Sequence, residues 1–109
     1  MMQVSEITWT ETEKEIAQQA FKKAYDREIM ALIDYVQDQS DKIAKIEDVW
    51  YLHDFLSARR HQIDGKYDYR YSVLLFVFAQ LLKEGWLYLE DIQGLEREKV
   101  SKISALSRM

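Results

Sequence analysis

The first forty residues carry apolar side chains at helical spacing. The stripe steps by four, four, three and four positions, which places its members on one face of an α-helix. Its members are Phe21, Tyr25, Ile29, Leu32 and Val36. Such a stripe is far more often the core-facing side of a helix than a cofactor-binding segment, so the pattern predicts one long amphipathic helix.

This helix has a start signal and no stop signal. Thr10 and Glu13 have the spacing of a capping box, which predicts a start after Trp9. The chain has no proline and only three glycines, so the helix is expected to continue to about Gln39. It would then be roughly 43 Å long, whereas a compact chain of this size is roughly 34 Å across. Part of the stripe must therefore extend beyond the core, and a second copy of the chain is its simplest cover.

A second helix is predicted between Ser40 and Gly65. Ser40 and Asp41 form a turn or a second helix start, and Gly65 is expected as the C-cap. The apolar positions between them again have helical spacing: Ile43, Ile46, Val49, Leu52, Leu56 and Ile63.

Shorter helices are predicted for the rest of the chain. The apolar run Tyr71–Leu82 has twelve residues, fewer than the ~20 that a membrane span needs. It fits a buried helix over about residues 69–84 that ends at Gly85, with Phe76 expected in the core because its neighbours are apolar. A short helical turn follows in WLYLED. A last helix near residues 96–107 has one apolar face: Val100, Ile103 and Leu106.

These elements predict an all-α fold in a single domain over residues 1–109. A long helical arm is expected over about residues 10–64, and a small C-terminal helical head over about residues 65–109. No strand is expected, because a lone strand would have no partner.

Composition narrows the possible functions. The net charge is −4, the pI is about 5.2 and no basic run compensates, which argues against a nucleic-acid-binding protein. Cysteine is absent, so disulfides, thiolate metal sites and cysteine nucleophiles are excluded. The segment MMQVSEITWTETEKEI lacks the basic and apolar regions of a signal peptide. A cytoplasmic protein is therefore expected.

The segment WYLHDFLSARRHQIDGKYD, residues 50–68, holds both histidines of the chain. On a helical wheel its unusual side chains form one contiguous stripe beside the apolar face. The members of this polar stripe are Trp50, His53, Asp54, Ser57, Arg60, His61 and Asp64.

Metal binding and catalysis both fit the polar stripe poorly. His53 and His61 lie eight positions apart, about 12 Å along a helix, whereas a helix-borne zinc pair uses positions i and i+4. Asp54 follows His53 directly, and helix neighbours point about 100° apart, so Asp54 is not expected to orient His53. Ser57 is within reach of His53, but no glycine-rich turn supplies an oxyanion hole. A hydrolase built on these three residues remains a minor alternative, and no metal site is expected.

Two interpretations of the stripe remain. Arg60 and Asp64 suit an exposed i,i+4 ion pair on a solvated face, which contributes a few tenths of a kcal/mol. That interpretation leaves Trp50 unexplained, because tryptophan and arginine are enriched at interface hot spots. The residues alone favour a protein-interaction face, with a plain solvated face next.

The longer segment WYLHDFLSARRHQIDGKYDYRYSVLLFVFAQLLKEGWL resembles the fluorescence recovery proteins of cyanobacteria. The similarity extends to WTETE, FKKAYDRE and the terminal EREKVSKISALSRM, so it covers almost the whole chain. The pattern WxxHDFLSxxRxxIDGKYDxR is long enough to be specific. The resemblance implies an all-helical homodimer, paired antiparallel, that holds no pigment, cofactor or metal and is not an enzyme.

The resemblance also implies a partner, the orange carotenoid protein. The light-activated red form of that protein docks on the phycobilisome and dissipates excitation as heat. The family binds the C-terminal domain of the red form, speeds its return to the orange form and helps release it from the phycobilisome, which ends the quenching and restores antenna fluorescence. Such a regulator would work in the cytoplasm near the thylakoid surface. A generic helical dimeric adaptor without a carotenoid-protein partner is the alternative.

Roles for individual residues are implied as well. The family's partner-binding patch matches Trp50, His53, Asp54 and Arg60, and a weaker second region in the head matches Phe76 and Lys102. The homodimer interface is expected at Ile33, Val36, Ile43, Ile46, Val49, Trp50, Leu52 and Leu56. Val49 stands where leucine is expected, and this apolar replacement affects only the strength of dimerisation.

Overall fold

The computed structural model describes residues 7–109. Its elements in chain order are α1 (Glu11–Asp41), α2 (Ile46–Lys66), α3 (Leu74–Glu84), the 3-10 helix η1 (Leu89–Ile92) and α4 (Arg97–Ser107). Every regular element in this part of the chain is helical, which confirms the all-α prediction. No helix among these residues combines the length and apolar character that crossing a membrane requires. The prediction that the chain starts without a signal peptide falls partly on residues 1–6, which lie outside the described residues.

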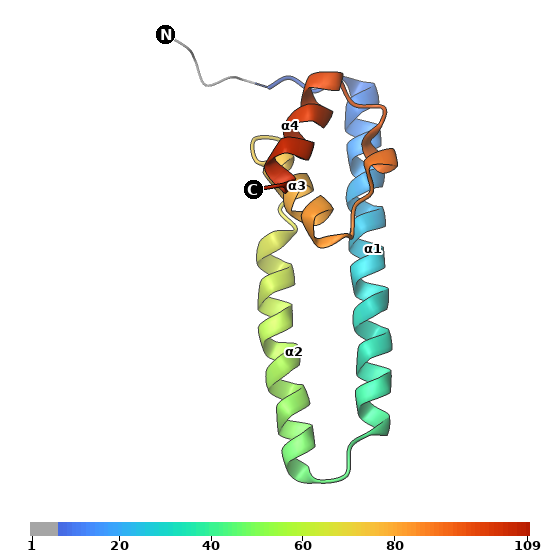
Figure 1. Cartoon of the computed structure of the whole chain (residues 1–109), viewed down its shortest axis with the longest axis vertical. Coiled ribbons are helices and arrows are strands. Elements are labelled where there is room, and N and C mark those ends of the chain that lie inside the picture. The colour runs from blue at the N-terminus through green and yellow to red at the C-terminus, as the bar shows by residue number, and fades with distance from the viewer. Residues whose placement is uncertain (1–6) are drawn as a thin grey trace.

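Figure 1 shows two long antiparallel helices, α1 and α2, with the shorter helices gathered at one end. The radius of gyration is 17.2 Å and the extents are 60 × 28 × 23 Å. A compact chain of this length has a radius of gyration of about 13 Å. The molecule is therefore elongated, and α1 does outrun the compact core, as predicted. We call residues 7–27 and 67–109 the packed end, and residues 28–66 the open hairpin.

The helix α1 begins where the sequence predicts. The Thr10 hydroxyl oxygen accepts a hydrogen bond from the Glu13 N–H at 3.0 Å, and a Glu13 carboxylate oxygen accepts one from the Thr10 N–H at 3.1 Å. This reciprocal cap satisfies N–H groups that the first turn leaves without intrahelical partners. The helix then runs for 31 residues without a break.

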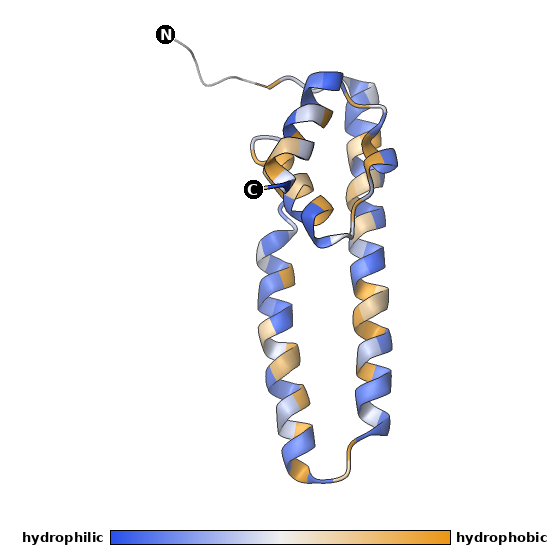
Figure 2. Ribbon diagram, in the orientation of Figure 1, coloured by the Kyte–Doolittle hydropathy of each residue, from blue (hydrophilic) through white to orange (hydrophobic). Residues whose placement is uncertain are grey.

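The core of the packed end lies between the first half of α1 and the shorter helices. On α1 it uses the small, fully buried side chains of Ala17, Ala20 and Ala24. Gly94 lies so close to Ile16 that a Cβ there would clash, so the chain after η1 passes directly over α1. In Figure 2 apolar residues are dense at this end, and they also continue along both long helices. The largest fully buried side chains are Phe78, Leu74, Leu81, Leu87, Ile92 and Ile103.

The prediction that Gly65 caps α2 is wrong. The helix continues to Lys66 and the cap residue is Tyr67, whose N–H bonds to the Ile63 carbonyl at 3.1 Å. The cause is a tertiary contact. In this geometry Lys66 and Tyr67 both bind the carboxylate of Glu28 on α1. That contact outweighs the local preference of glycine for a left-handed turn.

The helix α3 is shorter at its start than predicted. The ring of Tyr69 packs edge-on against Phe21 of α1, with 4.8 Å between ring centroids. Residues 67–73 therefore form a loop and turn that carry aromatic rings to α1, and α3 starts only at Leu74. It ends at Gly85, whose φ of 88° is the left-handed cap conformation that the sequence predicted.

Candidate docking surface

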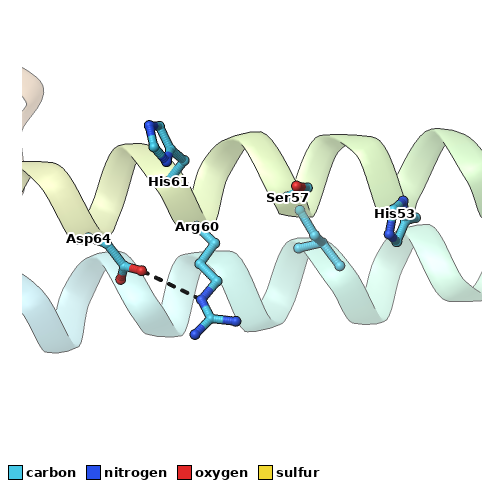
Figure 3. A pocket seen from close by; sticks show the side chains of 6 residues that line it. His53, Ser57, Arg60, His61 and Asp64 are labelled. Atoms are coloured by element: carbon cyan, nitrogen blue, oxygen red, sulfur yellow. Dashed lines mark ion pairs between the residues drawn. The ribbon is translucent and has the colours of Figure 1, made fainter.

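The polar stripe predicted on the second helix lies along α2 in the open hairpin. Figure 3 shows Arg60 and Asp64 joined on one side of the helix, with His61 turned toward the other edge. Part of the stripe lines an open depression of about 530 Å³, whose residues are His53, Leu56, Ser57, Arg60, His61 and Asp64. Most of the predicted side chains are thus brought together, on a shallow surface.

The large side chains of the stripe have little to hold them within the chain. Arg60 Nε lies 3.5 Å from Asp64 Oδ2, and the two side chains are 85% and 69% exposed. A pair this exposed contributes well under about 1 kcal/mol. Trp50 is 58% exposed, although an indole is usually well buried. An exposed indole and a weakly paired guanidinium on one helix suit contact with another protein.

The expectation that His53 and Asp54 point apart is wrong. His53 Nδ1 lies 3.2 Å from Asp54 Oδ1, so the two neighbours do meet. Their side chains are nevertheless 70% and 80% exposed, and water competes for both groups. A general base works in a concave site that positions a substrate and excludes water. The open stripe therefore offers contact groups more readily than catalytic ones.

The two histidines occupy separate places along the stripe. His53 and His61 lie about two turns apart on α2, as their spacing predicts. Across residues 7–109, no three histidine or acidic side chains come together in a group able to hold a metal ion.

Phe76 is on the surface, so the expectation that it lies in the core is wrong. It is 63% exposed, while Phe78 on the same helix is fully buried. The sequence did hold a signal for this, because Gln80, Lys83 and Glu84 follow Phe76 by four, seven and eight positions and share its exposed face. Lys102 on α4 is exposed as well. Both residues expected to form the second contact region are therefore accessible.

The open hairpin also exposes apolar side chains. The residue Ile63 is the one buried position within α2, and Tyr35 meets Phe55 across the hairpin with 4.8 Å between ring centroids. Among the expected dimer-interface residues, Val36, Leu52 and Leu56 are half-buried. The others are exposed: Ile33, Ile43, Ile46, Val49 and Trp50. A single chain thus leaves uncovered an apolar surface of the kind that marks an interface.

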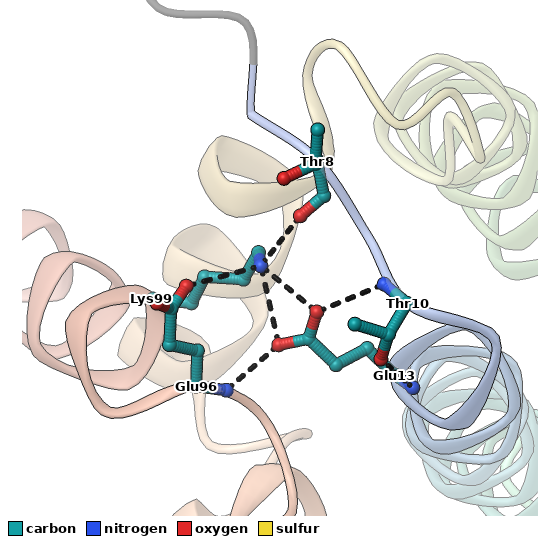
Figure 4. A network of polar contacts seen from close by, with 5 residues as sticks. All are labelled: Thr8, Thr10, Glu13, Glu96 and Lys99. Carbon is teal, nitrogen blue, oxygen red and sulfur yellow. Dashed lines mark hydrogen bonds and ion pairs between the residues drawn. The ribbon is translucent and has the colours of Figure 1, made fainter.

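The packed end holds a buried polar cluster that sequence reasoning missed (Figure 4). Lys99 Nζ lies 2.9 Å from Glu13 Oε1 and donates to the Thr8 carbonyl at 2.7 Å. The Glu96 N–H donates to Glu13 Oε2 at 2.8 Å. Burial alone would raise the pKa of Glu13, but the hydrogen bonds from Glu96, Lys99 and Thr10 outweigh it and lower the pKa. The cluster fastens the start of α1 to α4.

A second polar contact joins α1 to η1. One Arg27 nitrogen, Nη1, lies 2.7 Å from Asp91 Oδ2 and donates to the Trp86 carbonyl at 2.8 Å. The guanidinium also lies over the Tyr88 ring, 3.9 Å from its centroid. Burial alone would raise the pKa of Asp91, but the bonds from Arg27 and the Tyr88 N–H outweigh it and lower the pKa. No local sequence signal marks this pair, since its members lie 64 positions apart.

Known proteins resemble almost the whole chain. The family model for the photoprotection regulator fluorescence recovery protein matches residues 9–107. The fluorescence recovery protein of Synechocystis sp. PCC 6803 is 52% identical over 109 residues, which is 100% of both chains. The solved structure of the Fremyella diplosiphon fluorescence recovery protein matches with a TM-score of 0.91 and 59% identity, covering 94% of this chain and 100% of that one. The R60K mutant of the Synechocystis protein matches with a TM-score of 0.90 and 52% identity over the same shares of the two chains.

Proposed function

Because the chain belongs to the fluorescence recovery protein family of photoprotection regulators, we propose that it binds the red form of the orange carotenoid protein. Binding to the C-terminal domain of that form would speed its return to the orange form and its release from the phycobilisome. Non-photochemical quenching then ends and antenna fluorescence recovers. The observation that supports this function best is the exposed stripe on α2 with Trp50 and Arg60.

The proposed working unit is an antiparallel homodimer. Exposed side chains on both helices of the open hairpin, such as Ile33, Ile46 and Val49, support this pairing. A second copy that covers them removes apolar area from water at about 25 cal/mol per Å². In an antiparallel pair the two hairpins overlap and the packed ends point away from each other. Each packed end then keeps Phe76 and Lys102 free for a partner.

The proposed mechanism is differential binding. The partner changes conformation as it relaxes, and a protein that binds the transition state of that change more tightly than the red form lowers the barrier. Each 1.4 kcal/mol of such preference increases the rate about tenfold. No covalent bond is made or broken, so we propose a regulator and not an enzyme. His53 and Asp54 then serve as contact groups beside Trp50.

The residue Arg60 gives the sharpest test. Its guanidinium can make a bidentate bond to a partner carboxylate, which lysine cannot reproduce. Arg60→Lys and Arg60→Leu should both lose most of the acceleration of red-to-orange relaxation, measured by absorption, while dimer mass stays constant. The R60K mutant of the Synechocystis relative has a matching fold, so the lysine variant is expected to fold. Arg59→Leu, at the preceding position of α2, removes the same charge and should keep the acceleration. Because the Arg59 guanidinium lies over the Phe55 ring, the stability of this control is measured alongside.

Other outcomes of this assay separate the alternatives. Full acceleration by Arg60→Leu would exclude Arg60 as a partner contact. A dimer that gives no acceleration even without substitutions would favour the generic helical adaptor.

A further inference from the structure

A third polar cluster lies where α2 ends, at the junction of the open hairpin and the packed end. Lys66 Nζ lies 2.7 Å from Glu28 Oε1 on α1 and 2.6 Å from Glu84 Oε1 on α3. The Tyr67 hydroxyl donates to Glu28 Oε1 at 2.7 Å. These four residues, which we call the Lys66 clamp, tie the end of α2 to two other helices.

The clamp is charged and largely buried. The Glu28 side chain is 3% exposed and the Lys66 side chain is 15% exposed. Burial and the hydrogen bond to Glu28 both raise the pKa of Tyr67, so its hydroxyl remains a donor. Burial alone would raise the pKa of Glu84, but the bonds from Lys66 and Gln80 outweigh it and lower the pKa. Moving α2 away would leave a buried charge without its partner, which is costly.

Within a single chain, the rest of α2 is held by few close contacts. Ile63 is its one buried residue, and the Tyr35–Phe55 ring contact joins it to α1 farther along the hairpin. Figure 1 shows the two long helices joined at the tip, while the packed end lies against the first half of α1. The placement of α2 relative to the packed end therefore depends strongly on the Lys66 clamp.

We propose that Lys66 is a positioning residue, which holds the α2 docking stripe in a fixed relation to Phe76 and Lys102 on the packed end. This inference rests on the proposed function. Two contact regions strengthen binding to one partner only if their geometry allows both to engage at once. Without the clamp, the arrangement that lets both regions contact the partner at once becomes one of several arrangements. The apparent affinity for the partner then falls in proportion to the population of that arrangement.

The first test needs no partner protein. Since the chain has no cysteine, spin labels can be attached at Ala58→Cys on α2 and Ser101→Cys on α4, both of which are exposed. Labelled chains are diluted with unlabelled ones, so that pulsed electron paramagnetic resonance reports distances within one chain. Lys66→Met should broaden the distance distribution at least about twofold, because α2 samples more positions. Lys66→Arg keeps the charge and should stay narrow.

The control and the fallback variant address stability. Lys22→Met removes an exposed ion pair with Asp26 on α1 and should leave the distribution unchanged. If Lys66→Met alone does not fold, the double variant Lys66→Met, Glu28→Gln removes both charges and leaves an amide acceptor for Tyr67. An unchanged distribution in the folded variant would overturn the proposal, as would a broad one in the unmutated protein.

The second test measures how loss of the Lys66 clamp affects the proposed activity. In the relaxation assay, Lys66→Met should raise the half-saturating concentration about tenfold and leave the saturating rate unchanged, because only the population of the competent arrangement falls. An unchanged half-saturating concentration, or a lower saturating rate, would overturn the positioning role. If the unmutated protein gives no acceleration, the proposed function fails, and the label distances still decide whether the clamp holds α2.

Discussion

The packed end and the open hairpin are both built from amphipathic helices, yet different contacts hold them. The packed end buries Phe78 completely and places charged pairs such as Glu13–Lys99 inside. The hairpin buries little of α2, and its Arg60–Asp64 pair is exposed to water. The packed end thus supplies most of the stability of the chain, whereas the hairpin surface is available for contact with other chains.

Truncating a large side chain to alanine in each region should give the largest difference in the free energy of unfolding. Phe78→Ala is expected to lower the free energy of unfolding by about 3–5 kcal/mol, because it leaves a cavity in a closed core. Phe55→Ala in the hairpin should cost under about half as much, since Phe55 is only half-buried. Phe76→Ala, at an exposed position of the same helix as Phe78, should cost less than about 1 kcal/mol. Urea denaturation measures the free energy of unfolding of all three variants. Equal losses for Phe78→Ala and Phe55→Ala would show that the two regions contribute equally to stability.

Breaking one ion pair in each region should give the next largest contrast. Lys99→Met leaves the Glu13 carboxylate buried without its cation, which should cost about 3 kcal/mol. Lys42→Met removes an exposed pair with Asp38 in the hairpin and should cost well under about 1 kcal/mol. Thermal unfolding of the two variants gives the comparison. A small loss for Lys99→Met would mean that water reaches Glu13.

Acid should weaken the packed end. Glu13, Glu84 and Asp91 all have pKa values lowered in the folded chain. A lowered folded pKa contributes stability that is present above the unfolded pKa and is lost as the pH falls through the folded value. With unfolded values of about 4, the melting temperature should be steady above about pH 5 and fall below it. A melting temperature that does not change between neutral pH and about pH 3 would contradict this.

The smallest effect on folding is expected for Val49→Glu in the hairpin. The side chain is exposed, so the free energy of unfolding of the single chain should change by less than about 1 kcal/mol. A charge in the proposed dimer seam should nevertheless favour monomers. Light scattering measures this, and a compact 13 kDa species for the unmutated chain would show that the hairpin needs no second copy.

Signals within a few residues of each other predicted much of the fold. The Thr10–Glu13 box gave the start of α1, Gly85 gave the end of α3, and the spacing of apolar residues gave the long helices. The start of α2 was predicted too early, because α1 continues to Asp41 and α2 begins only at Ile46. The polar stripe on α2 was also visible, because residues at helical spacing share a face whatever the tertiary structure.

The errors had two sources. The expectation for Phe76 considered only its apolar neighbours in the sequence, although Gln80, Lys83 and Glu84 lie on the same helix face and mark it as exposed. The other errors came from positions that the tertiary structure decides. Gly65 fails as a cap because Lys66 and Tyr67 reach Glu28, 38 and 39 positions away. The carboxylate of Glu13 was expected only as a capping group, and its partner Lys99 lies 86 positions farther along the chain. No pattern of local spacing contains such pairs.

The bond from Lys99 to the Thr8 carbonyl spans 91 positions, which has a consequence for the order of synthesis. On the ribosome α1 and α2 emerge well before α4 exists, so the alanine face of α1 stays exposed to water until the end of the chain is made. Contacts between such distant positions form late, because the loop between them must close first. Loss of the last helix would therefore uncover the face of α3 against which α4 packs and leave a chain more prone to aggregation.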